Sequence, residues 1–156
     1  MTANLTFMMG KFPAPLPGDL RYAAKNHMWC READGRHRFG FTAYAVRLMQ
    51  DVYFLDWAVS PGVPLHYLQQ IGHIETSKAE SDLFCPLAGV IVQFNPELLK
   101  DPAAINYDKY GAGWLFEMTG NPDTLLGVVE YHQYLADNWE HTQRVIKGKI
   151  NTDSDD

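Results

Sequence analysis

The chain has 156 residues, a length that suits one domain and leaves little room for two. Apolar residues make up 46% and charged residues 21%, which excludes a disordered or fibrous class. The formal net charge is −6 at pH 7 and no basic stripe offsets it, so we expect no binding to nucleic acid. No apolar stretch approaches the ~18 residues that predict a membrane span.

Residues 1–20 hold three closely spaced prolines and no regular apolar period, which predicts an irregular N-terminal arm. Residues 21–31 favour a strand, and the turn at 33–36 leads to a second strand over 38–41. Thr42 is a suitable N-cap for a short helix that ends near Met49. The first third of the chain is therefore expected to be an arm, a hairpin and a helix.

The rest of the chain alternates short apolar runs with turns. Strands are expected over 52–55, 65–69, 71–76, 83–86 with its continuation 89–94, and 111–118, and helices over 95–99, 121–127 and 130–147. Such a pattern predicts a mainly β fold, a small sandwich or barrel with a C-terminal helical annex. We divide the chain into the arm 1–20, one domain over 21–148 and an acidic, disordered tail within 149–156.

The first 13 residues contain one lysine and no arginine, unlike a signal or transit sequence, so we expect a cytoplasmic protein. The six histidines have no metal-ligand spacing, and no metal site is predicted. No nucleophile elbow, phosphate loop or dinucleotide fingerprint is present. The sequence therefore predicts no enzyme active site.

The connection at residues 77–81 places Lys78 at the apex of a predicted hairpin. Ser77 and Ala79 are small, so an enzyme could close around the lysine amine and acylate it. A lysine at a hairpin tip is more often a plain solvated charge, and the local pattern leaves both interpretations open.

Residues 75–79, which include Glu75, Ser77, Lys78 and Ala79, resemble a lipoyl-attachment motif. The chain from 20 to 139 resembles the H-protein family of the glycine cleavage system. Further matching residues are Tyr22, Ala23, His27, Trp29, Gly40, Phe41, Tyr44, Asp82, Pro86, Gly89, Asn95, Gly113 and Trp114. The resemblance implies a lipoyl-domain-like barrel-sandwich hybrid and a non-catalytic carrier. It also implies lipoic acid in amide linkage to Lys78, cycling between disulfide and dithiol on a swinging arm.

The chain departs from the family pattern at several positions, and two of them bear on the cargo of the arm. Met28 stands where the family has a glutamate that faces the loaded arm, and Asn26 replaces a small hydroxyl residue. Asp82, which the family also uses near the arm, is present. A thioether cannot pair with an ammonium group. The pattern therefore favours a relative of the H protein, the lipoate-binding protein of a heterodisulfide-reductase-like sulfur oxidation system.

Cys30 and Cys85 are too few for a disulfide framework. Cys85 follows Lys78 by seven residues, so an exposed thiolate there could exchange with a lipoyl disulfide or accept sulfur. The alternative is that both are small buried apolar residues, because free cysteine is among the most buried residue types. We therefore keep both cysteines as candidate redox residues.

Three functions remain open on the sequence. The first is sulfur transfer with a heterodisulfide-reductase-like complex and dihydrolipoamide dehydrogenase. The second is a glycine cleavage H protein that carries an aminomethyl group between the glycine cleavage enzymes. The third is an adaptor that kept the β-sandwich and lost the cofactor. Both carriers require a lipoate ligase or lipoyl transferase, and a carrier that visits several enzymes works well as a monomer.

Overall fold

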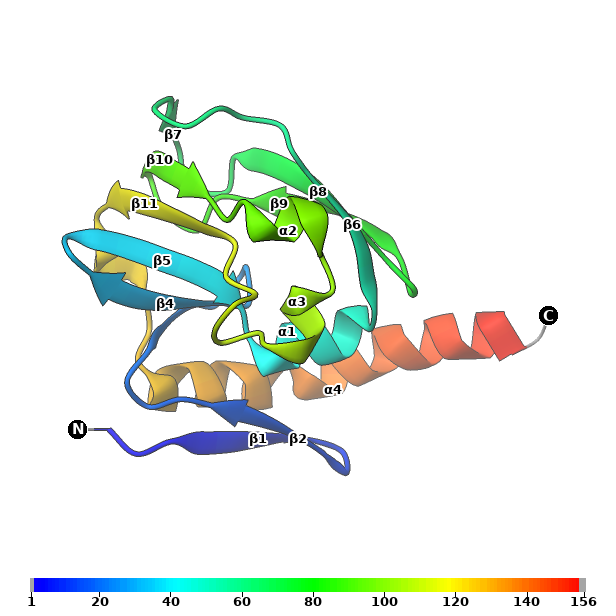
Figure 1. Ribbon diagram of the computed structural model, residues 1–156. Coiled ribbons are helices and arrows are strands. Elements are labelled where there is room, and N and C mark those ends of the chain that lie inside the picture. The colour runs from blue at the N-terminus through cyan, green and yellow to red at the C-terminus, as the bar shows by residue number, and fades with distance from the viewer. Residues whose placement is uncertain (1, 155–156) are drawn as a thin grey trace.

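The computed structural model describes residues 2–154, with side chains through residue 145. The chain folds into two sheets that face each other, flanked by a hairpin and a long helix (Figure 1). The mainly β class and the C-terminal helical annex predicted from the sequence are confirmed. Within the described residues, no helix is both long and apolar enough to cross a membrane.

The larger sheet has six strands in the order β3-β4-β5-β11-β10-β7. Their bounds are Arg21–Ala23, Met28–Ala33, Arg36–Phe41, Phe116–Gly120, Gly89–Phe94 and Pro64–Leu65. The predicted hairpin across 33–36 is confirmed as β4–β5, in which Ala33 pairs with Arg36. The last strand begins later than the sequence predicts, because residues 111–114 form turns closed by bonds to Asp108.

The smaller sheet consists of β6 (Val52–Trp57), β8 (Gln70–Thr76) and β9 (Glu80–Phe84), in the order β6-β8-β9. The predicted second strand of the lysine hairpin is wrong in one respect. It divides into β9 and β10, which lie in different sheets, because the turn after Cys85 carries the chain from one layer to the other. At this point the chain therefore connects the two sheets of the sandwich.

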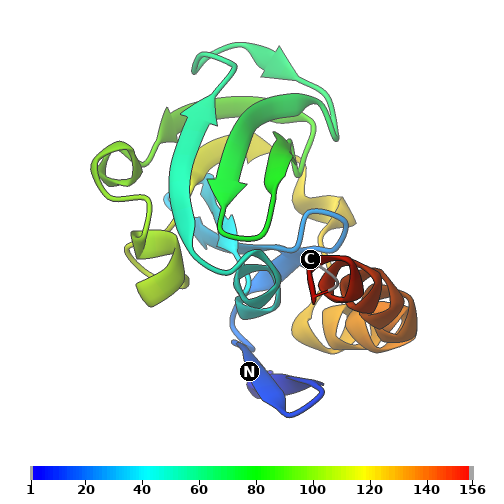
Figure 2. The same cartoon turned by 90° about the vertical axis from the view of Figure 1, so that its right-hand side faces the viewer.

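Residues 2–20, the described part of the predicted arm, are not irregular. They form a separate antiparallel hairpin of β1 (Leu5–Met9) and β2 (Phe12–Leu16). The proline-based prediction fails because a two-stranded sheet consists only of edge strands, where a proline without an N–H is tolerated. Figures 1 and 2 show this hairpin together with the last helix on one side of the molecule, away from β7.

The helices are short except for the last. Thr42 caps α1 (Ala43–Met49) as predicted, its side chain accepting from the Ala45 N–H. The others are α2 (Glu97–Lys100), α3 (Ala104–Tyr107), the 3-10 turn η1 (Pro122–Thr124) and α4 (Val128–Ser154). Helix α4 continues through Ser154, so the disorder predicted for residues 152–156 is wrong for 152–154. Residues 155 and 156 lie outside the described part.

Two apolar clusters hold these elements together. The larger fills the space between the sheets and includes Phe39, Ile74 and Phe116. The smaller joins the N-terminal hairpin to α1 and α4. There, Phe7 makes edge contacts with Tyr44 and Trp139 at ring-centroid distances of 5.8 and 5.5 Å. The larger core thus lies between the two sheets, whereas the smaller one joins the hairpin, α1 and α4 to β3 and β4.

Candidate functional site

Lys78 lies at the exposed tip of the β8–β9 hairpin. The turn is closed by Thr76, whose N–H donates to the Ala79 carbonyl at 2.9 Å. The Thr76 hydroxyl accepts from the N–H groups of Lys78 and Ala79 and donates to the Ala79 carbonyl, each at 3.2 Å. Because Thr76 is 5% exposed, these bonds are shielded from water. The backbone at Lys78 is therefore held in place while the side chain stays free.

A second brace comes from the start of β6. The Ser77 N–H donates to the Asp51 carbonyl at 2.9 Å, and the Asp51 N–H donates to the Ser77 hydroxyl at 3.2 Å. Ser77 therefore does more than leave room for an enzyme, because its side chain fixes the turn to the rest of the sheet. The predicted attachment residues Ser77, Lys78 and Ala79 are all exposed.

Acidic side chains cover the outer face of the lysine hairpin. Glu75 pairs directly with Glu80 across β8–β9, and His73 pairs with Asp82. His73 Nδ1 is 3.4 Å from an Asp82 oxygen and its Nε2 is 3.6 Å from a Glu75 oxygen. Candidate ligand atoms of His73, Glu75 and Glu80 lie within 4.8 Å of one another. Sequence spacing misses this cluster because strand pairing creates it, and exposed acidic groups commonly adopt such arrangements without a metal.

Of the two positions that depart from the family pattern, Asn26 contacts the far end of β9 and Met28 lies in the core. The Asn26 amide donates to the Phe84 carbonyl at 2.9 Å, while its Oδ1 is buried without a hydrogen-bond partner. Met28 is 1% exposed and belongs to the inter-sheet core. Its thioether therefore packs inward from β4, whereas the glutamate that the family pattern has at this position is expected to face the arm.

Both cysteines are buried, and the redox role considered for them is not supported by their surroundings. Burial raises the pKa of Cys30 to about 12. Burial also raises the pKa of Cys85, whose thiol donates to the Leu87 carbonyl at 2.9 Å. Because the thiolate is the reactive form, neither residue is poised to exchange with a disulfide. They are the small buried residues of the alternative interpretation.

A buried polar network beneath α1 was not predicted from the sequence. His27 has a positive φ of 52° and its Nδ1 is hydrogen-bonded to the Tyr131 hydroxyl at 2.9 Å. The Tyr131 hydroxyl also contacts the Thr42 hydroxyl at 3.1 Å. Burial lowers the pKa of His27 to about 4. The network joins the turn between β3 and β4 to α1 and α4. It therefore stabilises the packing of these elements and makes no contact with the lysine tip.

An exposed lysine on a rigid hairpin of a two-sheet sandwich is the arrangement expected of a carrier domain, a protein that presents a lysine for acylation. A family model for the glycine cleavage H-protein matches residues 20–139. The chain belongs to this family.

Related proteins agree with the family match. The chain is 37% identical over 121 residues to the glycine cleavage system H protein of Chromobacterium violaceum, covering 76% of this chain and 93% of the relative. It is 36% identical over 124 residues to that of Neisseria meningitidis serogroup C, covering 78% and 95%. The crystal structure of a glycine cleavage system H protein from Mycobacterium marinum is 34% identical, with a TM-score of 0.65, and covers 79% of this chain and 98% of the other.

The family consists of non-catalytic lipoyl carriers with lipoate bound covalently to a lysine. The barrel-sandwich fold and the carrier class inferred from the sequence are thus confirmed. The more specific prediction of sulfur oxidation gains no support from these relatives, whose names refer to glycine cleavage.

Proposed function

We propose that this protein is a lipoyl carrier modified on Lys78 and serves glycine cleavage, carrying an aminomethyl group between the enzymes of that system. The observation that carries the proposal is the position of Lys78, exposed at a tip whose backbone is braced by Thr76 and by the Asp51–Ser77 pair. Lipoate bound there supplies a disulfide that can be reduced to a dithiol. The chain supplies the fixed base from which the arm swings, and tethering raises the local concentration of the arm at each partner.

The residues at the tip fit an acylated lysine. Ser77 and Ala79 leave the amine accessible, and Glu75 and Asp82 stand on the same hairpin as charges for recognition. The partners under this proposal are a lipoate ligase or lipoyl transferase, the glycine cleavage enzymes and dihydrolipoamide dehydrogenase. Cytoplasmic location and a monomeric state stay predictions of the sequence.

Sulfur transfer is the second candidate, and one observation favours it. Position 28 holds a methionine that faces the core, so this position supplies no carboxylate to an aminomethyl nitrogen. A neutral sulfur cargo needs no such partner. A heterodisulfide-reductase-like complex would then be the partner in place of the glycine cleavage enzymes.

Intact mass with peptide mapping of the protein purified from its own host tests the carrier directly. We expect a lipoyl increment on Lys78 in the wild type and none in Lys78→Arg, which keeps the charge and removes the acylation site. An aminomethyl adduct on the arm supports glycine cleavage, whereas added sulfur atoms support sulfur transfer. An unmodified Lys78 in cells that lipoylate other proteins contradicts the proposal and leaves the adaptor.

A further inference from the structure

Two neighbouring aromatic side chains of β6, Tyr53 and Phe54, both lie on the surface. Tyr53 is 61% exposed and Phe54 is 43% exposed, whereas the residues on either side of them, Val52 and Leu55, are buried. Successive residues of a regular strand point to opposite faces, so an unbroken β6 would turn one of the two rings into the core. The pair is therefore exposed by a departure from regular strand geometry.

The departure is a bulge in the pairing of β6 with β8. Val52 pairs with Thr76 and Phe54 pairs with Glu75, so the register shifts at Tyr53. A bulge leaves one residue without a partner and redirects its side chain, and bulges are enriched next to functional sites. Here the bulge lies opposite residues 75–76, directly before the lysine tip, and it keeps both aromatic rings outside the core.

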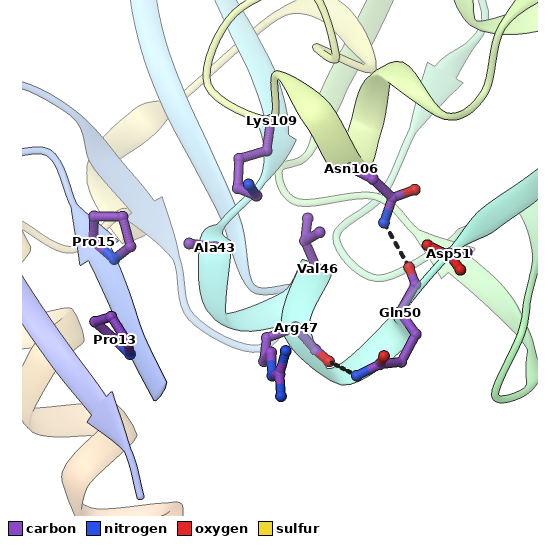
Figure 3. A pocket seen from close by; sticks show the side chains of 9 residues that line it. All are labelled: Pro13, Pro15, Ala43, Val46, Arg47, Gln50, Asp51, Asn106 and Lys109. Atoms are coloured by element: carbon purple, nitrogen blue, oxygen red, sulfur yellow. Dashed lines mark hydrogen bonds between the residues drawn. The ribbon is translucent and has the colours of Figure 1, made fainter. Parts of the chain in front are cut away.

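The start of β6 is fixed by hydrogen bonds to α3 and to the lysine tip. The Asn106 amide donates to the Gln50 carbonyl at 2.6 Å, and its Oδ1 accepts from the Val52 N–H at 2.9 Å. Figure 3 shows the first of these bonds in the lining of a surface groove. Asp51 exchanges two hydrogen bonds with Ser77. The bulge and the lysine tip are therefore held in a fixed relative position.

Both rings lie within the area that an enzyme acting on Lys78 covers. A protein–protein interface of ordinary size covers about 800 Å² of each partner, which is a disc of about 16 Å radius. Phe54 pairs with Glu75, three residues before Lys78. It is therefore at most about 10 Å along the strand and about 5 Å across the sheet from the lysine backbone. The footprint of an enzyme that reaches the Lys78 amine thus includes Phe54 and its neighbour Tyr53.

Acidic side chains border the aromatic pair. Strand pairing places Glu75 beside Phe54 and Glu80 beside Glu75. In the next row of the sheet, Asp56 pairs with His73. Interfaces commonly have an aromatic centre with a polar rim, and tyrosine is among the residues that contribute most to binding. A partner that fits this surface has an apolar pocket with lysine or arginine side chains around it.

We propose that Tyr53 and Phe54 form the apolar contact through which the enzyme that attaches lipoate binds the lysine hairpin. The inference rests on the proposed lipoylation of Lys78. While the enzyme holds the two rings, the Lys78 amine attacks the carbonyl carbon of an activated lipoyl group and loses a proton. An amide bond forms and the activating group leaves. The rings thus position the amine and take no part in the bond changes.

Steady-state lipoylation kinetics test this contact. The unlipoylated full-length protein is the varied substrate of the acylating enzyme of its own host, supplied with lipoate and ATP or with a lipoyl donor protein. Intact mass measures the modified fraction. The variants are Tyr53→Thr and Phe54→Thr, because threonine keeps strand propensity and removes the ring.

The matched control is Tyr67→Thr. Tyr67 is 43% exposed, as Phe54 is, but it precedes β8. The length of that strand separates Tyr67 from the lysine tip by about 20 Å, which is outside the expected footprint. Tyr53→Phe is a second control, because it keeps the ring at the bulge. Circular dichroism verifies that each variant is folded before its kinetics are measured.

We expect each threonine variant at Tyr53 and Phe54 to raise the KM for the carrier by about fivefold or more. The kcat should stay within about twofold, because the lost contact binds the ground state and the transition state alike. Tyr53→Phe and Tyr67→Thr should keep the wild-type KM.

An unchanged KM in either folded variant, or an equal rise in Tyr67→Thr, overturns the docking assignment and leaves the carrier proposal intact. Wild-type protein that is not lipoylated on Lys78 overturns both. If Phe54→Thr does not fold, Tyr53→Thr decides the comparison.

Discussion

His27 combines a left-handed backbone conformation with a hydrogen bond to Tyr131 in the network beneath α1. Its pKa is about 4 in the folded protein because of burial, whereas an unfolded imidazole titrates near 6.5. Between these values the unfolded chain binds more protons, so stability rises with pH. The contribution of His27 to the free energy of unfolding is fully present above pH 6.5 and is lost as the pH falls towards 4.

We expect His27→Asn to reduce this acid sensitivity, because asparagine tolerates a positive φ and does not titrate. The free energy of unfolding of the wild type should fall between pH 7 and pH 4 by up to about 3 kcal/mol more than that of the variant. Urea denaturation at several pH values measures the difference. If the free energy of unfolding falls in parallel with pH for the two proteins, carboxylates alone cause the loss of stability in acid.

The two cysteines should be unreactive until the protein unfolds. Both thiols are buried and burial raises both pKa values, so a thiol reagent at pH 8 should label the native protein slowly and the urea-unfolded protein fully. Cys85→Ser should leave loading of the arm unchanged. Rapid labelling of Cys85 in the native state would restore it as a redox candidate.

Among the elements, the N-terminal hairpin depends on its contacts with α1 and α4. An isolated two-stranded hairpin is marginally stable in water, so docking must supply its stability. Phe7 is 5% exposed and its ring contacts Tyr44, His132 and Trp139. The His132 ring also contacts the Thr6 carbonyl at 3.2 Å. These contacts hold the hairpin against α1 and α4.

Phe7→Ala should release the hairpin before it unfolds the sandwich. Loss of a buried aromatic ring costs about 3–5 kcal/mol where a core cannot relax, which exceeds what a short hairpin can sustain alone. Hydrogen exchange should therefore speed up in β1 and β2 and stay slow in β8. Met8→Ala is the matched control, because Met8 is 51% exposed. Equal protection of β1 and β2 from hydrogen exchange in both variants would contradict the role of Phe7 in docking the hairpin.

At the scale of the whole molecule, negative charge gathers on the smaller sheet. Strands β6, β8 and β9 carry Asp56, Glu75, Glu80 and Asp82 and contain no lysine or arginine. Like charges directly opposite each other, as at Glu75 and Glu80, destabilise a sheet. Acylation of Lys78 would remove one positive charge and change the formal net charge from −6 to −7. The loaded tip is therefore expected to attract a basic partner surface.

Association with the enzyme that lipoylates Lys78 should slow as ionic strength rises. The double variant Asp56→Lys and Glu80→Lys should reduce the association rate by about tenfold at low salt, because opposite charges steer encounter. Stopped-flow measurements over a salt series give this rate. Glu140→Lys, on an exposed position of α4, should have little effect. A similar decrease of the association rate in both variants would show that net charge, and not the charge on the smaller sheet, controls association.

Local patterns in the sequence were sufficient for several features, because each depends on nearby residues. The turn at 33–36, the Thr42 cap and the strand before Lys78 follow from short-range turn, capping and alternation rules. The family resemblance added the fold and the carrier class. The lysine itself was a local observation, a charged residue between two small ones at a hairpin apex.

Other features required the tertiary structure, because they depend on which segments meet. The prolines of residues 12–16 can join a strand only because that strand pairs with β1 and docks on α1 and α4. The inward direction of Met28 and the burial of Cys85 are set by the packing of the two sheets. A surface groove brings together residues of β2, α1 and the segment after α3, which are far apart in the sequence. The sequence alone thus determined the family and the carrier class and predicted the lysine, whereas long-range packing decided what surrounds the hairpin tip.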